Sequence, residues 1–158
     1  MNNNTTRQQI EAELSKIYIK NIIVIDWGRG GRPVARYIHH ENCEIITVDS
    51  KSDCRADLVA DMCKPLTIKE ADMAFCLEAL EHCYDLDVVL DNIYNNLKIN
   101  GKLFISAPFI YPRHGHRDYW RFTELGIKHI LSRHKFKILK IIKLQYDIRI
   151  GYFIEAMK

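Results

Sequence analysis

Glycines and aspartates near the start of the chain are spaced in a way that suits the binding of a nucleoside. Gly28, Gly30 and Gly31 follow an apolar run that ends at Asp26, and Asp49 closes the next apolar run. Glycine tolerates positive φ and lets a ligand approach the backbone closely. A carboxylate at the tip of the following strand accepts hydrogen bonds from both hydroxyls of a ribose. The spacing therefore predicts a nucleoside site at the carboxyl ends of neighbouring parallel strands.

The residues around this turn narrow the kind of nucleoside that it suits. A dinucleotide fingerprint would place a third glycine where Pro33 stands, and the Gly-Lys-Ser/Thr of a phosphate-binding loop is absent from the sequence. A pyrophosphate at the start of a helix is thus disfavoured, and a ligand without phosphate is favoured. Asp61, which closes a third short apolar run, is placed to accept the amino group of adenine.

The elements that must position these residues alternate between strands and helices. Five apolar runs predict parallel strands, at 21–26, 44–48, 57–60, 72–77 and 102–107, the last closed by Pro108. Helices are expected after a capping box of Thr6 and Gln9, from Pro33, over 86–97 and after Thr123, with at most a vestigial helix in 50–56. A short connection between 136–144 and 148–156 predicts an antiparallel hairpin that supplies an antiparallel edge strand.

These elements define the expected fold class. The chain has 158 residues, about the length of one domain. We expect an α/β fold, a three-layer sandwich around a mostly parallel seven-stranded sheet that ends in an antiparallel C-terminal hairpin.

Four segments resemble motifs of the class I S-adenosylmethionine (SAM)-dependent methyltransferases. They correspond to the Gly-rich first motif, the ribose-binding acid, the adenine-holding segment and the "LEH" segment after the fourth strand: 24–30, 48–49, 60–66 and 77–82. The resemblance implies a Rossmann-like SAM-binding domain over 21–158, preceded by a helical extension over 1–20. It also implies SAM as cofactor and this set of cofactor-binding residues: Asp26, Gly28, Gly30, Gly31, Asp49, Ser50, Asp61, Met62 and Cys76.

The first motif departs from the family at two positions, of which Arg32, in place of the common third glycine, is accepted by a narrower subgroup of the family. Arg29 stands where the family usually has a cysteine. If this arginine points into the site, its charge opposes the binding of a positively charged sulfonium, whereas the fold tolerates it if it points away.

The second half of the chain has a narrower resemblance. A subgroup of small bacterial-type methyltransferases, which often accompany glycan or other specialised biosynthesis, has segments similar to 30–33, 107–109, 114–116 and 118–123, the last reading Asp-Tyr-Trp-Arg-Phe-Thr. In this last segment we expect Trp120 and Phe122 to be structural and either Tyr119 or Arg121 to face the site.

Three histidines follow the predicted fourth and fifth strands. His82, His114 and His116 are candidates for the base that takes a proton from an alcohol acceptor, because the pKa of histidine lies near neutrality. The alternative is that they are ordinary loop residues, or that they satisfy backbone carbonyl groups. No further ligand sits at a recognised spacing from the His-x-His pair, so no metal is expected.

The expected function is SAM-dependent methyl transfer to a small molecule or glycan, most simply to oxygen. A nucleic-acid methyltransferase is an alternative, but the Asn/Asp-Pro-Pro-aromatic motif is missing where the chain has 76–79, and the net charge of +3 is mild. A non-catalytic scaffold or partner protein with the same fold is a third hypothesis. A homodimer is compatible with each of them.

The cysteines and the hydropathy pattern bear on location. Five cysteines without a Cys-x-x-Cys pair suit reduced thiols, so a cytoplasmic protein is expected. No apolar run reaches 18 residues, so no membrane partner is expected.

Overall fold

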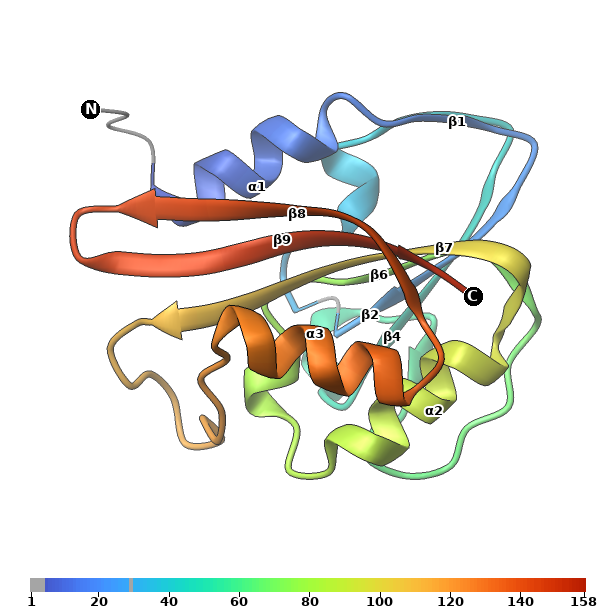
Figure 1. Ribbon diagram of the computed structural model, residues 1–158. Coiled ribbons are helices and arrows are strands. Elements are labelled where there is room, and N and C mark those ends of the chain that lie inside the picture. The colour runs from blue at the N-terminus through green and yellow to red at the C-terminus, as the bar shows by residue number, and fades with distance from the viewer. Residues whose placement is uncertain (1–4, 29) are drawn as a thin grey trace.

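A seven-stranded sheet runs through the molecule with helices on both faces (Figure 1). The computed structural model describes residues 5–28 and 30–158. The strands of this sheet are β2 (Ile23–Trp27), β4 (Glu44–Asp49), β5 (Leu58–Val59), β6 (Ala71–Cys76), β7 (Leu97–Ile110), β8 (Lys137–Tyr146) and β9 (Arg149–Met157). Their order is β5-β4-β2-β6-β7-β9-β8. The α/β class and the mostly parallel seven-stranded sheet are confirmed.

Two apolar cores fill the space between the sheet and its helices. On one face, α1 (Thr6–Leu14) buries Ile10 and Leu14 against the sheet. On the other face lie α2 (Leu86–Asn95) and α3 (Glu124–Arg133), which bury their own apolar stripes. The central strands β2 and β6 are buried almost throughout because both of their faces are covered.

The sequence suggested that the antiparallel strand lies at the edge of the sheet, but it lies one strand further in. β9 pairs antiparallel with both β7 and β8, and β8 forms the edge. The two strands of the C-terminal hairpin are present, but the second is inserted between the first and the rest of the sheet. This position buries most of β9 and leaves the lysine-bearing β8 outermost.

The helix ends follow the expected capping chemistry, with one correction. Thr5, not Thr6, caps α1: its hydroxyl accepts the Gln8 N–H while the Gln8 side chain accepts the Thr5 N–H. The capping box was therefore placed one residue too late along the chain. Thr123 caps α3 as predicted, through a hydrogen bond from the Gly126 N–H.

The helix predicted from Pro33 is not formed. A single 3₁₀ turn, η1 (Val34–Arg36), takes its place, and the chain then extends into β3 (His39–Glu41). β3 pairs in parallel with β1 (Tyr18–Lys20), a strand that the sequence did not reveal, in a separate two-stranded sheet. The apolar spacing of Val34, Tyr37 and Ile38 predicted a helix, but the chain leaves η1 after one turn and pairs with β1 through the polar residues that follow.

Other boundaries shift by smaller amounts. β7 continues through the Asn100-Gly101 pair and past Pro108, because the ladder with β9 absorbs the proline at a register shift between Pro108 and Ile110. The vestigial helix expected between the second and third strands is η2 (Ser52–Cys54), a 3₁₀ turn. A last 3₁₀ turn, η3 (Leu80–His82), follows β6.

All five cysteines are free of disulfide bonds. Among the described residues, no helix is both long enough and apolar enough to cross a membrane.

Gly28 is the glycine that the packing of the sheet requires most strictly. Its φ is +71°, and a Cβ added there would lie 2.5 Å from the Cβ of Ala79. We expect Gly28→Ala to lower the free energy of unfolding by about 2–5 kcal/mol, through left-handed strain and overpacking together. Urea unfolding followed by circular dichroism measures the change.

Gly31→Ala is the matched control, because no heavy atom lies within 4 Å of a Cβ built at Gly31. This variant should leave the unfolding free energy within about 0.5 kcal/mol of the parent. Equal effects of the two substitutions would show that the contact with Ala79 is not what makes glycine necessary.

Candidate active site

The carboxyl ends of four parallel strands meet at one edge of the sheet. β5, β4, β2 and β6 are neighbours in that order, so the residues that follow them are brought together. Every residue proposed from the sequence to bind a cofactor lies at or just after one of these ends: Asp26, Gly28, Gly30, Gly31, Asp49, Ser50, Asp61, Met62 and Cys76. This is the edge at which open parallel sheets bind their ligands.

Two buried carboxylates hold the Gly-rich turn after β2. Oδ2 of Asp26 accepts the Val34 N–H at 2.7 Å, a hydrogen bond that closes the whole turn. Oδ2 of Asp49 accepts the Gly30 N–H at 2.7 Å. The turn is thus fixed from β2 on one side and from β4 on the other. Arg29, on which the question of sulfonium repulsion depends, lies outside the described residues.

Asp49 has the chemistry required of a ribose ligand. Its other oxygen, Oδ1, accepts the Lys51 N–H at 2.9 Å, so both oxygens are held in place by the backbone. An ionised carboxylate offers about four lone-pair sites, and these two hydrogen bonds leave two for ribose hydroxyls. Beside it, a Cβ at Gly30 or Gly31 would meet no heavy atom within 4 Å, which leaves open space next to the carboxylate. The Asp49 carboxylate and the open space beside it therefore fit the ribose of the nucleoside part of SAM.

The remaining cofactor candidates line this edge in different ways. Asp61 is half-buried, and its Oδ1 accepts the Cys63 N–H at 3.0 Å. Met62 packs partly buried against the main core, and Ser50 is exposed. Cys76 is fully buried at the end of β6, and burial raises the pKa of its thiol well above the ordinary value. A thiol that is neutral and fully buried has a packing role at this end of β6 and is not a nucleophile.

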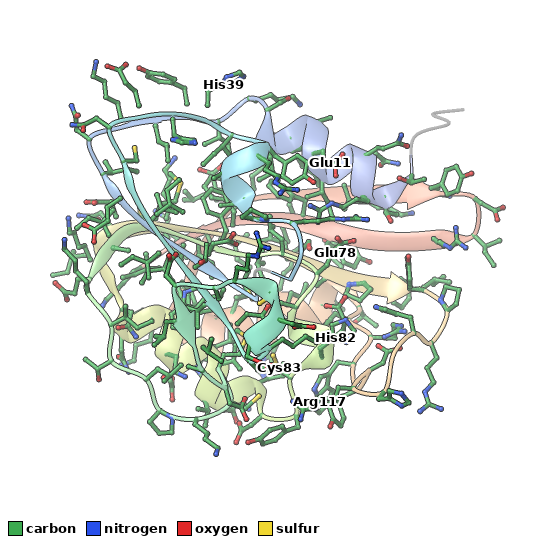
Figure 2. The ribbon with its side chains drawn as sticks, turned by 180° about the vertical axis from the view of Figure 1, so that it is seen from behind. Glu11, His39, Glu78, His82, Cys83 and Arg117 are labelled. Atoms are coloured by element: carbon green, nitrogen blue, oxygen red, sulfur yellow. The ribbon has the colours of Figure 1, made fainter. Side chains whose placement is uncertain are left out.

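A cavity of about 230 Å³ opens beyond the ends of β6 and β7. Its wall includes Glu78, Glu81, Ser106, Tyr111 and His114, and α1 closes it from the other side. The Ser106 hydroxyl accepts the Glu78 N–H at 2.7 Å, and the Glu78 carboxylate pairs with Arg7 of α1 at 2.6 Å. Figure 2 shows Glu78 between α1 and the segment that carries His82. These contacts join the N-terminal helix to the site.

Glu81 is the functional candidate that the sequence did not single out. The residue is 3% exposed, and its Oε2 has no hydrogen-bond partner among the described residues. Burial, with a contribution from the charge of Glu78, raises its pKa to about 7. The only feature of the sequence that could have pointed to Glu81 is its place next to the candidate base His82 in the "LEH" segment.

The structure brings two of the three candidate histidines together. The rings of His82 and His114 meet edge to face with centroids 4.9 Å apart, although the residues follow different strands. The third candidate, His116, is exposed, and in the described part of the chain its side chain makes no hydrogen bond, ion pair or ring contact.

The segment 118–123 organises the loop that carries His114. Arg121 binds both oxygens of Asp118, at 2.6 and 2.7 Å, and also donates to the carbonyl groups of Tyr111 and Pro112. Asp118 in turn accepts the His114 N–H at 2.8 Å. Hydrogen bonds from Arg121 hold the pKa of Asp118 well below its usual range despite burial, so this carboxylate stays charged.

The aromatic residues of the same segment differ in their surroundings. Phe122 is buried in the main core, as expected. Trp120 is 40% exposed and donates its indole N–H to the Cys83 carbonyl at 2.6 Å, which ties the loop to the end of η3. Tyr119 is exposed, and its backbone N–H donates to the Glu81 carbonyl at 2.7 Å. The segment therefore acts mainly as a scaffold for the cavity wall.

Many solved structures share this fold. The Burkholderia thailandensis 1,6-didemethyltoxoflavin-N1-methyltransferase, crystallised with 1,6-didemethyltoxoflavin and S-adenosylhomocysteine, is 17% identical and has a TM-score of 0.77 over 97% of this chain and 78% of its own. The N-methyltransferase NodS of Bradyrhizobium japonicum is 14% identical, with a TM-score of 0.71 over 100% and 99% of the two chains.

A third similar structure also holds the demethylated cofactor. The magnesium protoporphyrin IX methyltransferase ChlM of Synechocystis, with bound S-adenosylhomocysteine, is 13% identical and has a TM-score of 0.70 over 97% of this chain and 83% of its own. No curated protein sequence matches the chain.

The family model of the methyltransferase domain matches residues 25–105, just over half of the chain. The matched region runs from β2 into β7 and contains the Gly-rich turn, Asp49, Asp61 and the "LEH" segment. The chain therefore belongs to the methyltransferase-domain family, with the class I fold and with S-adenosylmethionine as the family's methyl donor.

Proposed function

We propose that this protein transfers the methyl group of SAM to a hydroxyl oxygen of a small molecule or glycan. The observation that carries the proposal is the cavity beyond β6 and β7, which lies next to the cofactor edge and has acid and imidazole groups on its wall. A volume of about 230 Å³ suits a small acceptor group.

The residues at the cofactor edge bind and orient. In this proposal Asp49 accepts the ribose hydroxyls, Asp61 accepts the adenine amino group, and the backbone of Gly30 and Gly31 allows close approach. SAM, when bound, supplies an electrophilic methyl group on a positively charged sulfur. The protein's task is then to hold an acceptor in line with that methyl group and to remove its proton.

Removal of the acceptor proton falls to His114 on the cavity wall or to His82, whose ring lies against it. His82 and His114 are the two candidate bases that the fold places side by side. His116 is the remaining candidate from the sequence and lacks such neighbours in the described structure. Because an alcohol acceptor requires a base, the imidazoles at this site support O-methylation.

The charges of the cavity wall favour a small acceptor over a nucleic acid. Among the described residues that line the cavity there is no Lys or Arg to bind a phosphate chain, and two of them, Glu78 and Glu81, are acids. The net charge of +3 offers little compensation. The scaffold hypothesis remains as one outcome of the experiments below.

Binding of S-adenosylhomocysteine tests the cofactor half of the proposal. Isothermal titration calorimetry should show one site per chain. Asp49→Asn should weaken this binding by at least tenfold, because hydrogen bonds to a charged acceptor contribute about 1.5–3 kcal/mol each. Asp53→Asn is the matched control: this acid lies four residues along the chain on η2, is exposed, and should leave the affinity unchanged.

Two outcomes of that titration would count against the proposal. No heat of binding up to millimolar ligand would leave the scaffold hypothesis in place of an enzyme. Unchanged affinity in Asp49→Asn, in a variant with parental circular dichroism, would show that the ribose binds elsewhere.

Methyl transfer tests the acceptor half. Incubation with tritiated SAM and a panel of phenols and sugars should label a hydroxyl oxygen. His114→Gln should lower that turnover by about 10²–10⁴-fold, the usual contribution of a general base, while cofactor affinity is retained. His129→Gln, an exposed position on α3, is the control. Full turnover in His114→Gln would show that this residue takes no part in the chemistry. If RNA and DNA are added to the panel and only they are labelled, the acceptor is a nucleic acid and not a small molecule or glycan.

A further inference from the structure

Glu81, His82 and His114 form a cluster whose composition is that of a metal site. One potential ligand atom from each residue lies within 4.8 Å of the other two. The cluster joins η3 to the loop after β7, so 31 residues separate His82 from His114 in the sequence and no ligand spacing is visible there. Of the His-x-His pair, His114 belongs to the cluster and His116 does not.

Both imidazoles are held in the way that metal-binding histidines usually are. Nδ1 of His82 faces the carbonyl oxygen of Arg117, and Figure 2 shows the two residues close together. Nδ1 of His114 lies 3.3 Å from the Pro112 carbonyl and 3.5 Å from a carboxylate oxygen of Asp118. A proton on each Nδ1 satisfies these acceptors and leaves Nε2 with a free lone pair.

Glu81 adds an independent observation. Its side chain is 4% exposed, and within the described residues Oε2 accepts no hydrogen bond. A buried carboxylate without a partner is costly unless a cation or a proton neutralises it. The other oxygen, Oε1, lies 4.0 Å from Nε2 of His82, the nitrogen that carries the free lone pair in this tautomer.

We propose that Glu81, His82 and His114 bind one divalent transition-metal ion at the wall of the acceptor cavity. Two imidazoles and one carboxylate suit Zn²⁺, Co²⁺, Fe²⁺ or Mn²⁺ rather than Ca²⁺ or Mg²⁺, which prefer oxygen ligands. Metal–ligand bonds of about 2.1 Å place ligand atoms roughly 3–3.5 Å apart. The three ligand atoms lie within 4.8 Å of one another, so binding of the ion requires them to draw closer, and three protein ligands leave further coordination positions for an acceptor oxygen.

The use of such an ion rests on the proposed function. A cation at this position binds an acceptor oxygen and lowers the pKa of its hydroxyl, as it does for bound water. The hydroxyl proton then leaves to solvent, and the oxygen lone pair forms the C–O bond as the C–S bond breaks and its electrons stay on sulfur. With the ion bound, His82 and His114 are its ligands, and the ion activates the acceptor hydroxyl in their place; without the ion they remain the candidate bases of the proposed function. His114→Gln lowers turnover in either case.

The test uses the full, tag-free chain, dialysed against a chelator and titrated with Co²⁺ alone. We expect one tight Co²⁺ per chain, with visible absorption bands from an ion bound by nitrogen and oxygen. Glu81→Gln and His114→Gln should each weaken binding by more than about 100-fold, beyond the 10–100-fold that is usual for loss of an outer hydrogen-bond partner. His129→Gln should bind as the parent does, and parental circular dichroism identifies variants that fold.

Three results would overturn the proposal: no Co²⁺, Mn²⁺ or Zn²⁺ bound up to millimolar concentration, binding that survives both Glu81→Gln and His114→Gln, or equal loss in His129→Gln. The Asp49→Asn variant separates this proposal from the proposed function, because it should lose S-adenosylhomocysteine and keep Co²⁺. A chain that binds S-adenosylhomocysteine but no metal refutes only the metal site. A chain that binds metal but no S-adenosylhomocysteine refutes only the methyltransferase.

Discussion

The hydrogen bond from the Val34 N–H to the Asp26 carboxylate is the constraint on which the cofactor edge depends. Most turns of this type are followed by a helix, whose own hydrogen bonds fix the chain beyond the glycines. Here the helix is reduced to η1, and a buried side chain performs that task. Asp26 is 4% exposed and Asp49 is 8% exposed, so both hydrogen bonds are shielded from water. Hydrogen bonds to buried charged acceptors are among the stronger ones in proteins.

The side of the site that carries the cavity depends on a different arrangement, a chain of contacts that starts from the ion pair of Arg121 and Asp118. Arg121 clamps Asp118, Asp118 holds the backbone at His114, and His114 reaches the ring of His82. Trp120 anchors the same loop to the Cys83 carbonyl. A loop that is exposed along most of its length thereby presents one side chain to a buried carboxylate at a fixed position. The two halves of the site are thus each held by charged groups, on opposite sides of β6.

The sequence predicted those features that depend on local pattern. β-branched runs located the strands of the parallel sheet, and the apolar spacing of α2 located that helix to within a few residues. The segment after Pro33 shows where this reasoning fails: Val34 and Ile38 are buried as an amphipathic helix would bury them, but pairing of β3 with β1 decides the conformation. Strand pairing between distant segments leaves no trace in a local window.

The candidate site divides in the same way. Asp26, Asp49 and the glycines could be identified because they sit at fixed distances from predicted strand ends. The meeting of Glu81 with His114 could not, since it depends on the path of the loop after β7 and on its clamp by Arg121. Burial of Glu81 is likewise a property of the packed molecule, and it is burial that distinguishes this carboxylate from the exposed acids of the chain.

The position of β9 has a consequence for synthesis of the chain. β9 lies between β7 and β8 but is made after both. Until β9 is available, β7 presents an unpaired edge of apolar strand, and β8 has no neighbour in the sheet. Exposed edges of this kind pair readily with other chains. The period before β9 inserts between β7 and β8 is therefore the one in which the edge of β7 is most open to pairing with other chains.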